Sequence, residues 1–411
     1  MGKAISWQEA RARVLANGGE PRPIEIVGLA AAHGRCLAEA VHADGPWPAT
    51  DRSAMDGFGV VAAAGLPAGT VLRVVGESLA GAPFVGAVAA GSAIRIMTGA
   101  VVPAGVTAVV PVEQTSGFAG AEVTLHTPVR PGQHIRPQGS EVAKGQLVLE
   151  LGRRLFAAEI GVLAVLGRDQ VRVARPVQVA IVATGDEVVP VECAPAPHQV
   201  RESNSWALAA QVHEAGAVAT RLGIAADEPA ALRAMLEQGL ATADVLITIG
   251  GVSKGTHDLV HGTLAALGVQ TIFHGIELKP GKPTFFGRRE HAGRVQYVFG
   301  LPGNPASSFT VFDLLVRPLL QRLVGAPVAA TFAELPVVGA PWQVNSRLQA
   351  VPAQLVVGPS GGLAVELAPP QPSGDPFSLL RGSVYALIPP AQPPGAGTVV
   401  VAGGSRGVFL P

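Results

Sequence analysis

The sequence predicts a multidomain protein of α/β plus β architecture. Two observations lead to this prediction: short valine-rich runs between glycines and prolines at about 46–147, and alternating strand-like and helical segments at 176–326. Evenly spaced short runs are typical of a small all-β module. Alternating strands and helices are typical of a three-layer domain, in which helices cover both faces of a parallel-type sheet. At 411 residues the chain is also too long for one core.

A discontinuous linking domain of mixed structure is expected from residues 1–45 together with 148–175. Within it, residues 6–17 read as a helix, with Ser6 as the N-cap and Glu9 as its capping-box partner. Residues 153–167 have helical periodicity and return the chain to the first segment. The all-β module at 46–147 is then an insertion into this domain.

The all-β module contains six strand-like runs: GVVAA, TVLRVVG, SAIRIMTG, TAVVPVE, AEVTLH and GQLVLE. Two of its segments also carry polar residues beside glycine, DRSAMDGFGV (51–60) and IRIMTGAVVPAG (94–105). Asp56-Gly57 is a natural tight turn. Thr98-Gly99 ends a strand with a hydroxyl and a backbone N–H group, so both segments are candidates for a functional site.

In the α/β domain at 176–326, three strand-like runs end in polar turns that contain glycine, and helical segments at 203–215 and 227–241 separate them. Because ligands bind beyond the carboxyl ends of parallel strands, we expect these turns to meet at one ligand site. Glycine lets a ligand approach the backbone, and helix-start N–H groups bind anions. The turn residues are Thr184, Gly185, Asp186 and Glu187; Gly250, Gly251, Ser253 and Asp258; and Gly303, Asn304 and Ser307, with Pro305 in the first turn of the next helix.

The segment KPGKP (279–283) adds two cations, Lys279 and Lys282, each followed by proline. Ammonium groups held rigidly in this way suit phosphate or another oxyanion. The segment is not a nucleotide-binding P-loop, because Pro283 stands where Ser or Thr is required. His257 and His261 have the i, i+4 spacing of a zinc site, but we favour Asp258 as a carboxylate that holds a divalent cation beside bound phosphates.

Residues 327–411 are again β-rich and punctuated by Pro and Gly, which predicts a C-terminal β domain.

The composition excludes some functions: 30 basic against 30 acidic residues give no charge footprint for nucleic acid or an anionic membrane. No apolar run is long enough for a membrane helix, and the N-terminus has no secretion signal. Two cysteines, Cys36 and Cys193, predict a reducing compartment without a disulfide framework. We therefore expect a cytoplasmic protein.

Taken together and in order, these segments resemble the MoeA family of molybdopterin molybdenumtransferases, to which the C-terminal part of gephyrin also belongs. The matching motifs cover nearly the whole chain and form a specific ordered set. They are SAMDG (53–57), MTGA (97–100), TGDE (184–187), SNS (203–205), GGVS (250–253) with the later Asp258, KPGKP (279–283) and GLPGNP (300–305).

The resemblance implies an elongated homodimer with four domains per subunit. These would be the linking domain (1–45 with 148–175), the β-rich module (46–147), a molybdopterin-binding α/β domain (176–326) and a C-terminal β-barrel-like domain (327–411). It places the active cleft between the α/β domain of one subunit and the β module of the other. A molybdopterin adenylyltransferase and molybdoenzyme maturation proteins are the implied partners.

The resemblance also implies the reaction, a Mg²⁺-dependent insertion of molybdate into the dithiolene of adenylylated molybdopterin with release of AMP. Such a reaction needs positioning and electrostatic stabilisation and no covalent nucleophile. The catalytic candidates are Asp56, Thr98, Glu187, Asp258, Lys279 and Lys282, and the metal candidates are Glu187, Asp227 and Asp258. The ligand-binding candidates are Thr184, Gly185, Ser203, Asn204, Gly250, Gly251, Ser253, Pro302, Gly303, Asn304, Ser307, Arg347 and Ser373.

The sequence departs from the family pattern in a few places. Lys254 and His257 give the second glycine turn extra basic character, and QGSEV (138–142) keeps only one carboxylate, Glu141. Pro352 stands at the second arginine of a strand that keeps only Arg347. Two alternatives remain open: a hydrolase or adenylyltransferase that acts on a pterin or nucleotide pyrophosphate, and a non-catalytic scaffold of the same fold. The β module, with Asp56 and Thr98, and KPGKP favour the transferase over the first alternative. The intact set of Asp56, Glu187, Asp258, Lys279 and Lys282 argues against the second.

Overall fold

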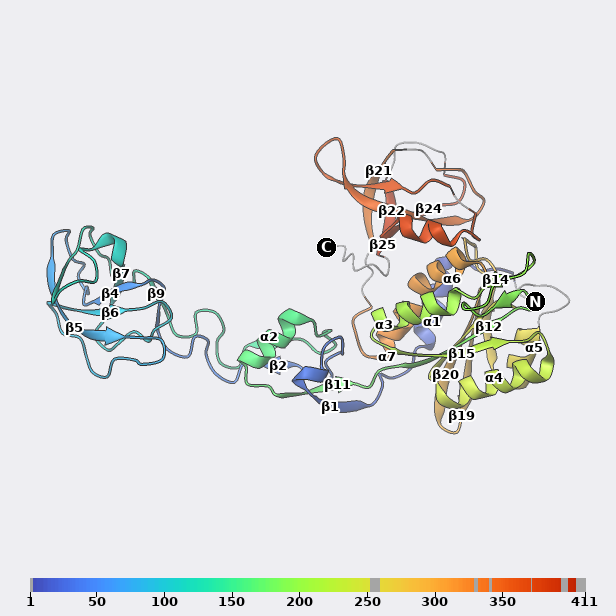
Figure 1. Ribbon diagram of the computed structural model, residues 1–411, viewed down its shortest axis with the longest axis horizontal. Coiled ribbons are helices and arrows are strands. Elements are labelled where there is room, and N and C mark those ends of the chain that lie inside the picture. Colours follow the sequence, from blue (N-terminus) through green and yellow to red (C-terminus); the bar gives the residue numbers. More distant parts are fainter. Residues whose placement is uncertain are drawn as a thin grey trace. The chain divides into compact units, whose positions relative to one another are not determined.

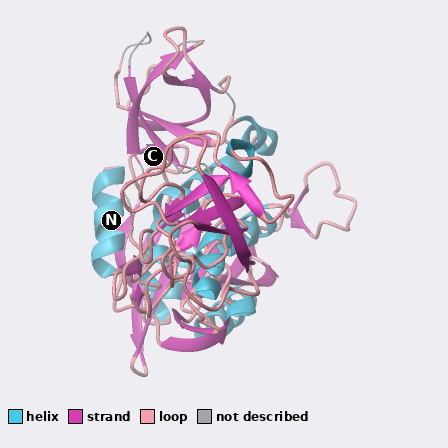
Figure 2. Ribbon diagram, turned by 90° about the vertical axis from the view of Figure 1, so that its left-hand side faces the viewer, coloured by secondary structure: helices cyan, strands magenta, loops and turns pink. Residues whose placement is uncertain are grey.

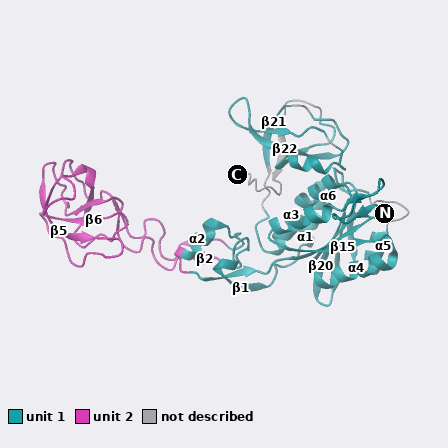
Figure 3. Cartoon of the chain, viewed as in Figure 1, with its two compact units in different colours: residues 1–39, 151–164, 168–411 teal, residues 40–150, 165–167 magenta. Residues whose placement is uncertain are grey.

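A computed structural model describes residues 3–251, 259–328, 332–339, 342–370, 372–392 and 398–403. The chain forms two compact units, one of residues 1–39, 151–164 and 168–411 and one of residues 40–150 and 165–167 (Figure 3). Helices and strands both contribute to the fold (Figure 2). The predicted multidomain α/β plus β class is confirmed.

A six-stranded sheet of order β15-β12-β16-β20-β19-β17 lies in the larger unit (Figure 1). The first four strands are parallel, as the sequence predicts for β12, β16 and β20, whereas β15 was not predicted. β19 and β17 extend the sheet as antiparallel strands that we did not predict. Ala292 and Gly293, with φ of 49° and 72°, form the tight turn that reverses the chain between β19 and β20. The strands are β12 (Gln178–Thr184), β15 (Val218–Ala225), β16 (Val245–Ile249), β17 (Gln270–His274), β19 (Phe285–His291) and β20 (Arg294–Leu301).

Helices cover both faces of this sheet because both faces are apolar. Val179 and Ile181 of β12 belong to one core cluster and Ala180 and Val182 to the other. Strands buried on both faces read as continuous apolar runs, which explains the sequence pattern. The first cluster includes residues of α1 (Trp7–Asn17), α3 (Asn204–Glu214), α6 (Pro305–Val311), a π-helical turn η3 (Phe312–Val316) and α7 (Arg317–Leu323). The second includes residues of α4 (Pro229–Thr242) and α5 (Leu259–Ala266).

The predicted N-terminal helix forms as α1, and the Ser6 hydroxyl accepts a hydrogen bond from the Glu9 amide at 3.1 Å. Only this half of the capping box is present, because the Glu9 carboxylate instead accepts from Arg13 at 2.5 Å. The other predicted helix of the linking region, 153–167, is shorter, as α2 (Ala157–Val165). Residues 153–155 are extended because their backbone pairs with residues 35–37.

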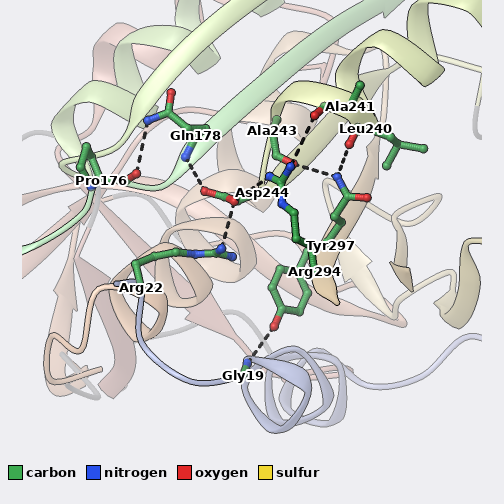
Figure 4. A network of polar contacts seen from close by, with 11 residues as sticks. Gly19, Arg22, Pro176, Gln178, Leu240, Ala241, Ala243, Asp244, Arg294 and Tyr297 are labelled. Atoms are coloured by element: carbon green, nitrogen blue, oxygen red, sulfur yellow. Dashed lines mark hydrogen bonds and ion pairs between the residues drawn. The ribbon is translucent and has the colours of Figure 1, made fainter. Parts of the chain in front are cut away.

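Two short strands, β1 (Ile24–Gly28) and β11 (Gln170–Ala174), pair antiparallel in the linking region. A polar network then attaches residues 19–22 to the six-stranded sheet (Figure 4). Asp244 is 8% exposed and accepts from the Arg22 guanidinium at 2.9 Å and from the Gln178 amide at 3.0 Å. Because Asp244 directly precedes β16, this network lies at the amino edge of the sheet, opposite the edge where the predicted site lies.

The smaller unit contains a five-stranded sheet of order β7-β4-β6-β5-β8. All six predicted runs form strands, but the last one, β10 (Leu147–Leu149), pairs with β2 (Val41–His42) and does not join this sheet. β5 and β6 are parallel, which the pattern did not reveal. The remaining strands are β3 (Arg52–Ser53), which pairs with β9 (Ile135–Arg136), and β4 (Gly57–Val60), β5 (Val71–Ser78), β6 (Ser92–Ile96), β7 (Ala108–Pro111) and β8 (Glu122–Thr124).

The C-terminal region forms a second six-stranded sheet, of order β18-β22-β23-β21-β25-β24. An additional pairing of β22 with β24 closes five of these strands into a ring. The first strand of the sheet, β18, includes Lys279 of KPGKP, so the α/β region contributes to this sheet. The strands are β18 (Leu278–Lys279), β21 (Phe332–Val338), β22 (Leu348–Val357), β23 (Leu363–Leu367), β24 (Val384–Ile388) and β25 (Thr398–Gly403). Two small strands of the α/β region, β13 (Val188–Val189) and β14 (Val200–Arg201), pair with each other.

Buried contacts join the C-terminal sheet to the helices of the α/β region. The Tyr385 hydroxyl donates to Asp313 at 3.3 Å, and Arg317 donates to the same carboxylate at 2.9 Å. Burial, followed by the negative charge of Asp313, raises the pKa of Tyr385 well above its ordinary value, so that this phenol stays neutral. In the part of the chain that the structure describes, no helix is long and apolar enough to cross a membrane.

Candidate functional site

The structure brings the glycine turns after β12, β16 and β20 together at the carboxyl edge of the sheet. The Gly250 amide donates to the Leu301 carbonyl at 3.0 Å, and the Thr184 hydroxyl donates to the Ile249 carbonyl at 3.2 Å. A Cβ atom on Gly250 would lie 2.9 Å from the Thr184 carbonyl oxygen, and the φ of Gly250 is 84°. Both crowding and the left-handed backbone therefore require glycine here, whatever ligand approaches.

Hydrogen bonds join the turn after β20 to α3 and to the C-terminal region. The Asn204 side-chain amide donates to the Gly303 carbonyl at 2.6 Å, and the Asn304 side-chain amide donates to the Ser373 hydroxyl at 2.9 Å. Gly303 and Asn304 are exposed, whereas Pro302 and Ser307 are buried and support the turn from within. The backbone of the turn is thus exposed to solvent, while hydrogen bonds from Asn204 on one side and to Ser373 on the other fix its position.

Three carboxylates gather beside the first turn. The Asp227 amide donates to the Asp186 carboxylate at 3.2 Å. Burial, and then the negative charges of Asp186 and Glu187, raise the pKa of Asp227. Mutual repulsion of this kind is relieved by a cation. Nevertheless, among the described residues no three acidic, histidine or cysteine side chains are grouped closely enough to hold a metal ion.

Lys279 and Lys282 are exposed, but their backbone is held from two sides. β18 pairs in parallel with β22, and Arg347 donates from Nη1 to the Leu278 carbonyl at 3.2 Å. Gly281 has a φ of 122°, and a Cβ atom there would lie 2.6 Å from a methyl group of Val311 in α6. Over the described part of the chain, no hydrogen bond or ion pair joins either ammonium group to the glycine turns.

In the smaller unit, the SAMDG and MTGA segments form one structure. The backbone N–H and the hydroxyl of Thr98 both donate to Oδ1 of Asp56 at 2.7 Å. These two donors, the backbone group first, lower the pKa of the exposed Asp56. The interpretation of Asp56-Gly57 as a tight turn is wrong, because Gly57 begins β4. Glycine is required there because a Cβ atom would lie 1.9 Å from the Val110 carbonyl oxygen.

In a Thr98→Val variant, the pKa of Asp56 is expected to rise, because the hydroxyl donor is lost while the backbone donor stays. A carboxyl group with a lowered folded-state pKa stabilises the fold above its unfolded-state pKa, and this contribution disappears as the pH falls through the folded-state value. The variant should therefore lose it at a higher pH than the wild type. Carboxyl ¹³C NMR titration of aspartate-labelled protein measures the shift. Thr70→Val, which removes a hydroxyl bonded to Pro67 in the same unit, is the control. An unchanged pKa of Asp56 in Thr98→Val would contradict this account.

Several predicted residues lie outside the described residues, namely Ser253 and Asp258, and with them Lys254 and His257. His261, which the sequence pairs with His257 at the i, i+4 spacing of a zinc site, lies on α5. Its Nε2 atom is 3.1 Å from the Thr271 hydroxyl, and its ring packs edge-on against Phe285. Ser203 precedes α3, and its side chain makes no capping hydrogen bond within the described chain.

The sequence analysis did not single out a polar cluster at the start of α3. Glu202 is 5% exposed and binds Ser205, which in turn accepts a hydrogen bond from Arg221. A cavity of about 340 Å³ adjoins this cluster and is lined by Glu192, Glu202, Trp206 and Arg221 among others. The only signal in the sequence was an acidic residue directly before SNS, which does not show whether the carboxylate is buried.

Comparison with known proteins places these features in context. Residues 5–167 match the MoeA N-terminal region (domain I and II), and residues 180–322 match a probable molybdopterin binding domain. The molybdopterin molybdenumtransferase of Nostoc sp. is 38% identical over 305 residues, which are 73% of this chain and 70% of the relative. That of Haemophilus influenzae is 35% identical over 321 residues, 78% of each chain.

Solved structures agree over almost the full length. A crystal structure of the molybdopterin biosynthesis MoeA protein from Pyrococcus horikoshii OT3 has a TM-score of 0.80 at 27% identity, and covers 98% of this chain and 100% of that one. A second structure of a Pyrococcus horikoshii MoeA protein has a TM-score of 0.76 at 29% identity and covers 98% and 99%. The fold and the candidate site define an α/β protein whose glycine turns meet at the carboxyl edge of a sheet, where the turn after β20 bonds to the C-terminal region. The chain belongs to the MoeA family.

Proposed function

We propose that this chain is a molybdopterin molybdenumtransferase, which inserts molybdate into the dithiolene of adenylylated molybdopterin and releases AMP. The observation that carries the proposal is the meeting of the three glycine turns at one edge of the sheet, with the last turn bonded to Ser373. Relatives with this name and 35% and 38% identity support it.

The turns around Gly250 and Gly303 suit the pyrophosphate of such a substrate. Gly251, Gly303 and Asn304 are exposed, so phosphate oxygens can approach their backbone N–H groups. Thr184 is 5% exposed, and its hydroxyl already donates to the Ile249 carbonyl, so we assign it to shaping the turn. The other ligand-binding candidates of this region, to which we assign contact with the same substrate, are Gly185, Ser203, Asn204 and Ser253.

Lys279 and Lys282 are proposed to attract molybdate, which is a dianion. Their exposed ammonium groups stand on a backbone held by β22 and α6, so that charge is presented with little reorganisation. Arg347 uses Nη1 to hold the Leu278 carbonyl, and Ser373 holds Asn304. We therefore assign Arg347 and Ser373 to the rim of the same site, between the lysines and the turn after β20.

Magnesium is proposed as the cation of the reaction, with Glu187, Asp227 and Asp258 as its ligands. Carboxylate oxygens are the donors that Mg²⁺ prefers. The raised pKa of Asp227, caused in part by the charges of Asp186 and Glu187, fits a position that gains from a nearby cation. The proposal depends on Asp258, because the described residues alone do not form a metal site. Bound Mg²⁺ would supply positive charge against the pyrophosphate.

We also propose a homodimer in which Asp56 and Thr98 of one subunit complete the site of the other. Mixing two defective proteins tests this. Asp56→Ala and Lys279→Ala are each expected to be nearly inactive, whereas subunit exchange between them should restore about a quarter of wild-type activity, because mixed dimers contain one intact site. Absence of any recovery after verified exchange would contradict a shared site.

One assay separates the transferase from its alternatives. The full chain is given adenylylated molybdopterin, Mg²⁺ and molybdate, and AMP release is measured together with reconstitution of an apo-molybdoenzyme. The proposal expects AMP release that depends on molybdate. Release that does not depend on molybdate would instead indicate a pyrophosphate hydrolase or adenylyltransferase, and no release would indicate a scaffold of the same fold.

A further inference from the structure

We infer that Glu202 is a positioning residue of this site: its buried carboxylate fixes the first turn of α3, so that Asn204 can hold the turn after β20. The inference rests on the proposed function, since the turn it serves belongs to the proposed substrate site. Glu202 itself is 5% exposed, and its carboxylate accepts hydrogen bonds from Ser205 of α3.

The Glu202 carboxylate takes over the capping of α3. One oxygen accepts from the Ser205 amide at 2.7 Å, and the other accepts from the Ser205 hydroxyl at 2.5 Å. The side chain of Ser203, at the N-cap position, makes no capping hydrogen bond within the described chain. Because the first N–H groups of a helix have no partner inside the helix, the carboxylate satisfies one that would otherwise be unpaired.

The same serine is also held from the neighbouring strand. Nε of Arg221, on β15, donates to the Ser205 hydroxyl at 2.8 Å. The guanidinium carbon of Arg221 lies 3.4 Å from the ring centroid of Trp206. The Ser205 hydroxyl thus donates to Glu202 and accepts from Arg221, which leaves its side chain one orientation.

Asn204 links this cap to the candidate site. It lies between Ser203, the N-cap residue, and Ser205, which Glu202 holds. Its side-chain amide donates to the Gly303 carbonyl at 2.6 Å. Asn304, which follows Gly303 in the chain, donates to Ser373 of the C-terminal region. Fixing Ser205 therefore fixes the backbone from which Asn204 reaches the turn. Hydrogen bonds, joined through the covalent neighbours Ser205–Asn204 and Gly303–Asn304, thus link Glu202 to Ser373.

Hydrogen–deuterium exchange of the full-length protein without substrate tests this coupling. In Glu202→Ala, amides of residues 301–308 are expected to exchange about tenfold faster than in the wild type, and in Glu202→Gln they should stay close to the wild type, because one oxygen can still accept from the Ser205 amide. Glu192→Ala is the matched control: this carboxylate lines the same cavity and is exposed. Faster exchange confined to residues 203–208 would show a helix cap alone and would overturn the inference.

Steady-state kinetics give the second readout. Glu202→Ala is expected to raise the KM for adenylylated molybdopterin about tenfold and to change kcat by no more than about twofold, with Glu202→Gln close to the wild type and Glu192→Ala unchanged. A wild-type KM in Glu202→Ala would overturn the positioning role. If the wild type itself released no AMP, the proposed function would fail, while the exchange comparison would still decide the role of Glu202.

Discussion

Asp244→Ala is expected to lower the free energy of unfolding by about 3 kcal/mol, as measured by urea denaturation. The Asp244 side chain is 10% exposed and forms ion pairs with Arg22 and Arg294, of which the first, at 2.9 Å, is itself only 18% exposed. Removing the carboxylate leaves the Arg22 charge partly buried without its partner and also leaves the Gln178 amide without its acceptor. Both costs add to the loss.

A surface pair in the same sheet provides the control. Glu290→Ala removes an ion pair with Arg288 in which the side chains are 69% and 37% exposed. Exposed pairs of this kind contribute roughly 0–1 kcal/mol, so this variant should unfold close to the wild type. Equal losses in the two variants would show that the buried network of Asp244 is not a special source of stability.

Lys279→Ala is expected to reduce molybdate-dependent AMP release about 100-fold, since loss of one preorganised charge at a developing anion typically has this effect. The fold should be unaffected, because the side chain is exposed and the backbone is held by pairing with Gln349. The difference between wild type and variant in the KM for molybdate should become smaller at high salt, because salt screens the ammonium contact that only the wild type makes.

The comparison variant is Lys3→Ala, another exposed lysine of the larger unit, which should release AMP at the wild-type rate. Melting temperatures of both variants show whether the fold is intact. Wild-type turnover in Lys279→Ala, with saturation by molybdate at the same concentration, would remove this lysine from the site.

The parts of the fold that were predictable are those in which local pattern and tertiary environment agree. β12, β16 and β20 are mainly apolar, as expected for strands that are covered on both faces, and the polar turns that follow them mark the carboxyl edge. The N-cap of α1 was visible in Ser6 because a cap depends on the adjacent turn alone. The antiparallel strands β17 and β19 were missed, since short runs of mixed polarity beside KPGKP have no distinctive period.

The candidate site divides in the same way. Glycine turns such as the one at Gly250 can be predicted from the sequence, because only glycine tolerates both the close approach of neighbouring atoms and a positive φ. The pairing of Asn304 with Ser373, and of Leu278 with Leu348, joins positions far apart in the chain, and no local pattern encodes such contacts. Glu202 was missed for a related reason: an acidic residue beside a helix start is ordinarily solvated, and its burial depends on β15 and α3 together.

The attachment of the N-terminal segment has a consequence for synthesis on the ribosome. Ile5 bridges to Ile276, the Arg22 amide donates to the Leu323 carbonyl, and Trp7 is buried in the same core. These partners emerge roughly 300 residues after the segment itself, which at ~5–20 residues per second is a delay of about 15–60 s. During that interval the contacts of this segment with Ile276 and Leu323 are missing, so the apolar face of α1 lacks part of the core into which it packs. Until α7 has been translated, the apolar face of α1 is exposed hydrophobic surface of the kind that chaperones bind.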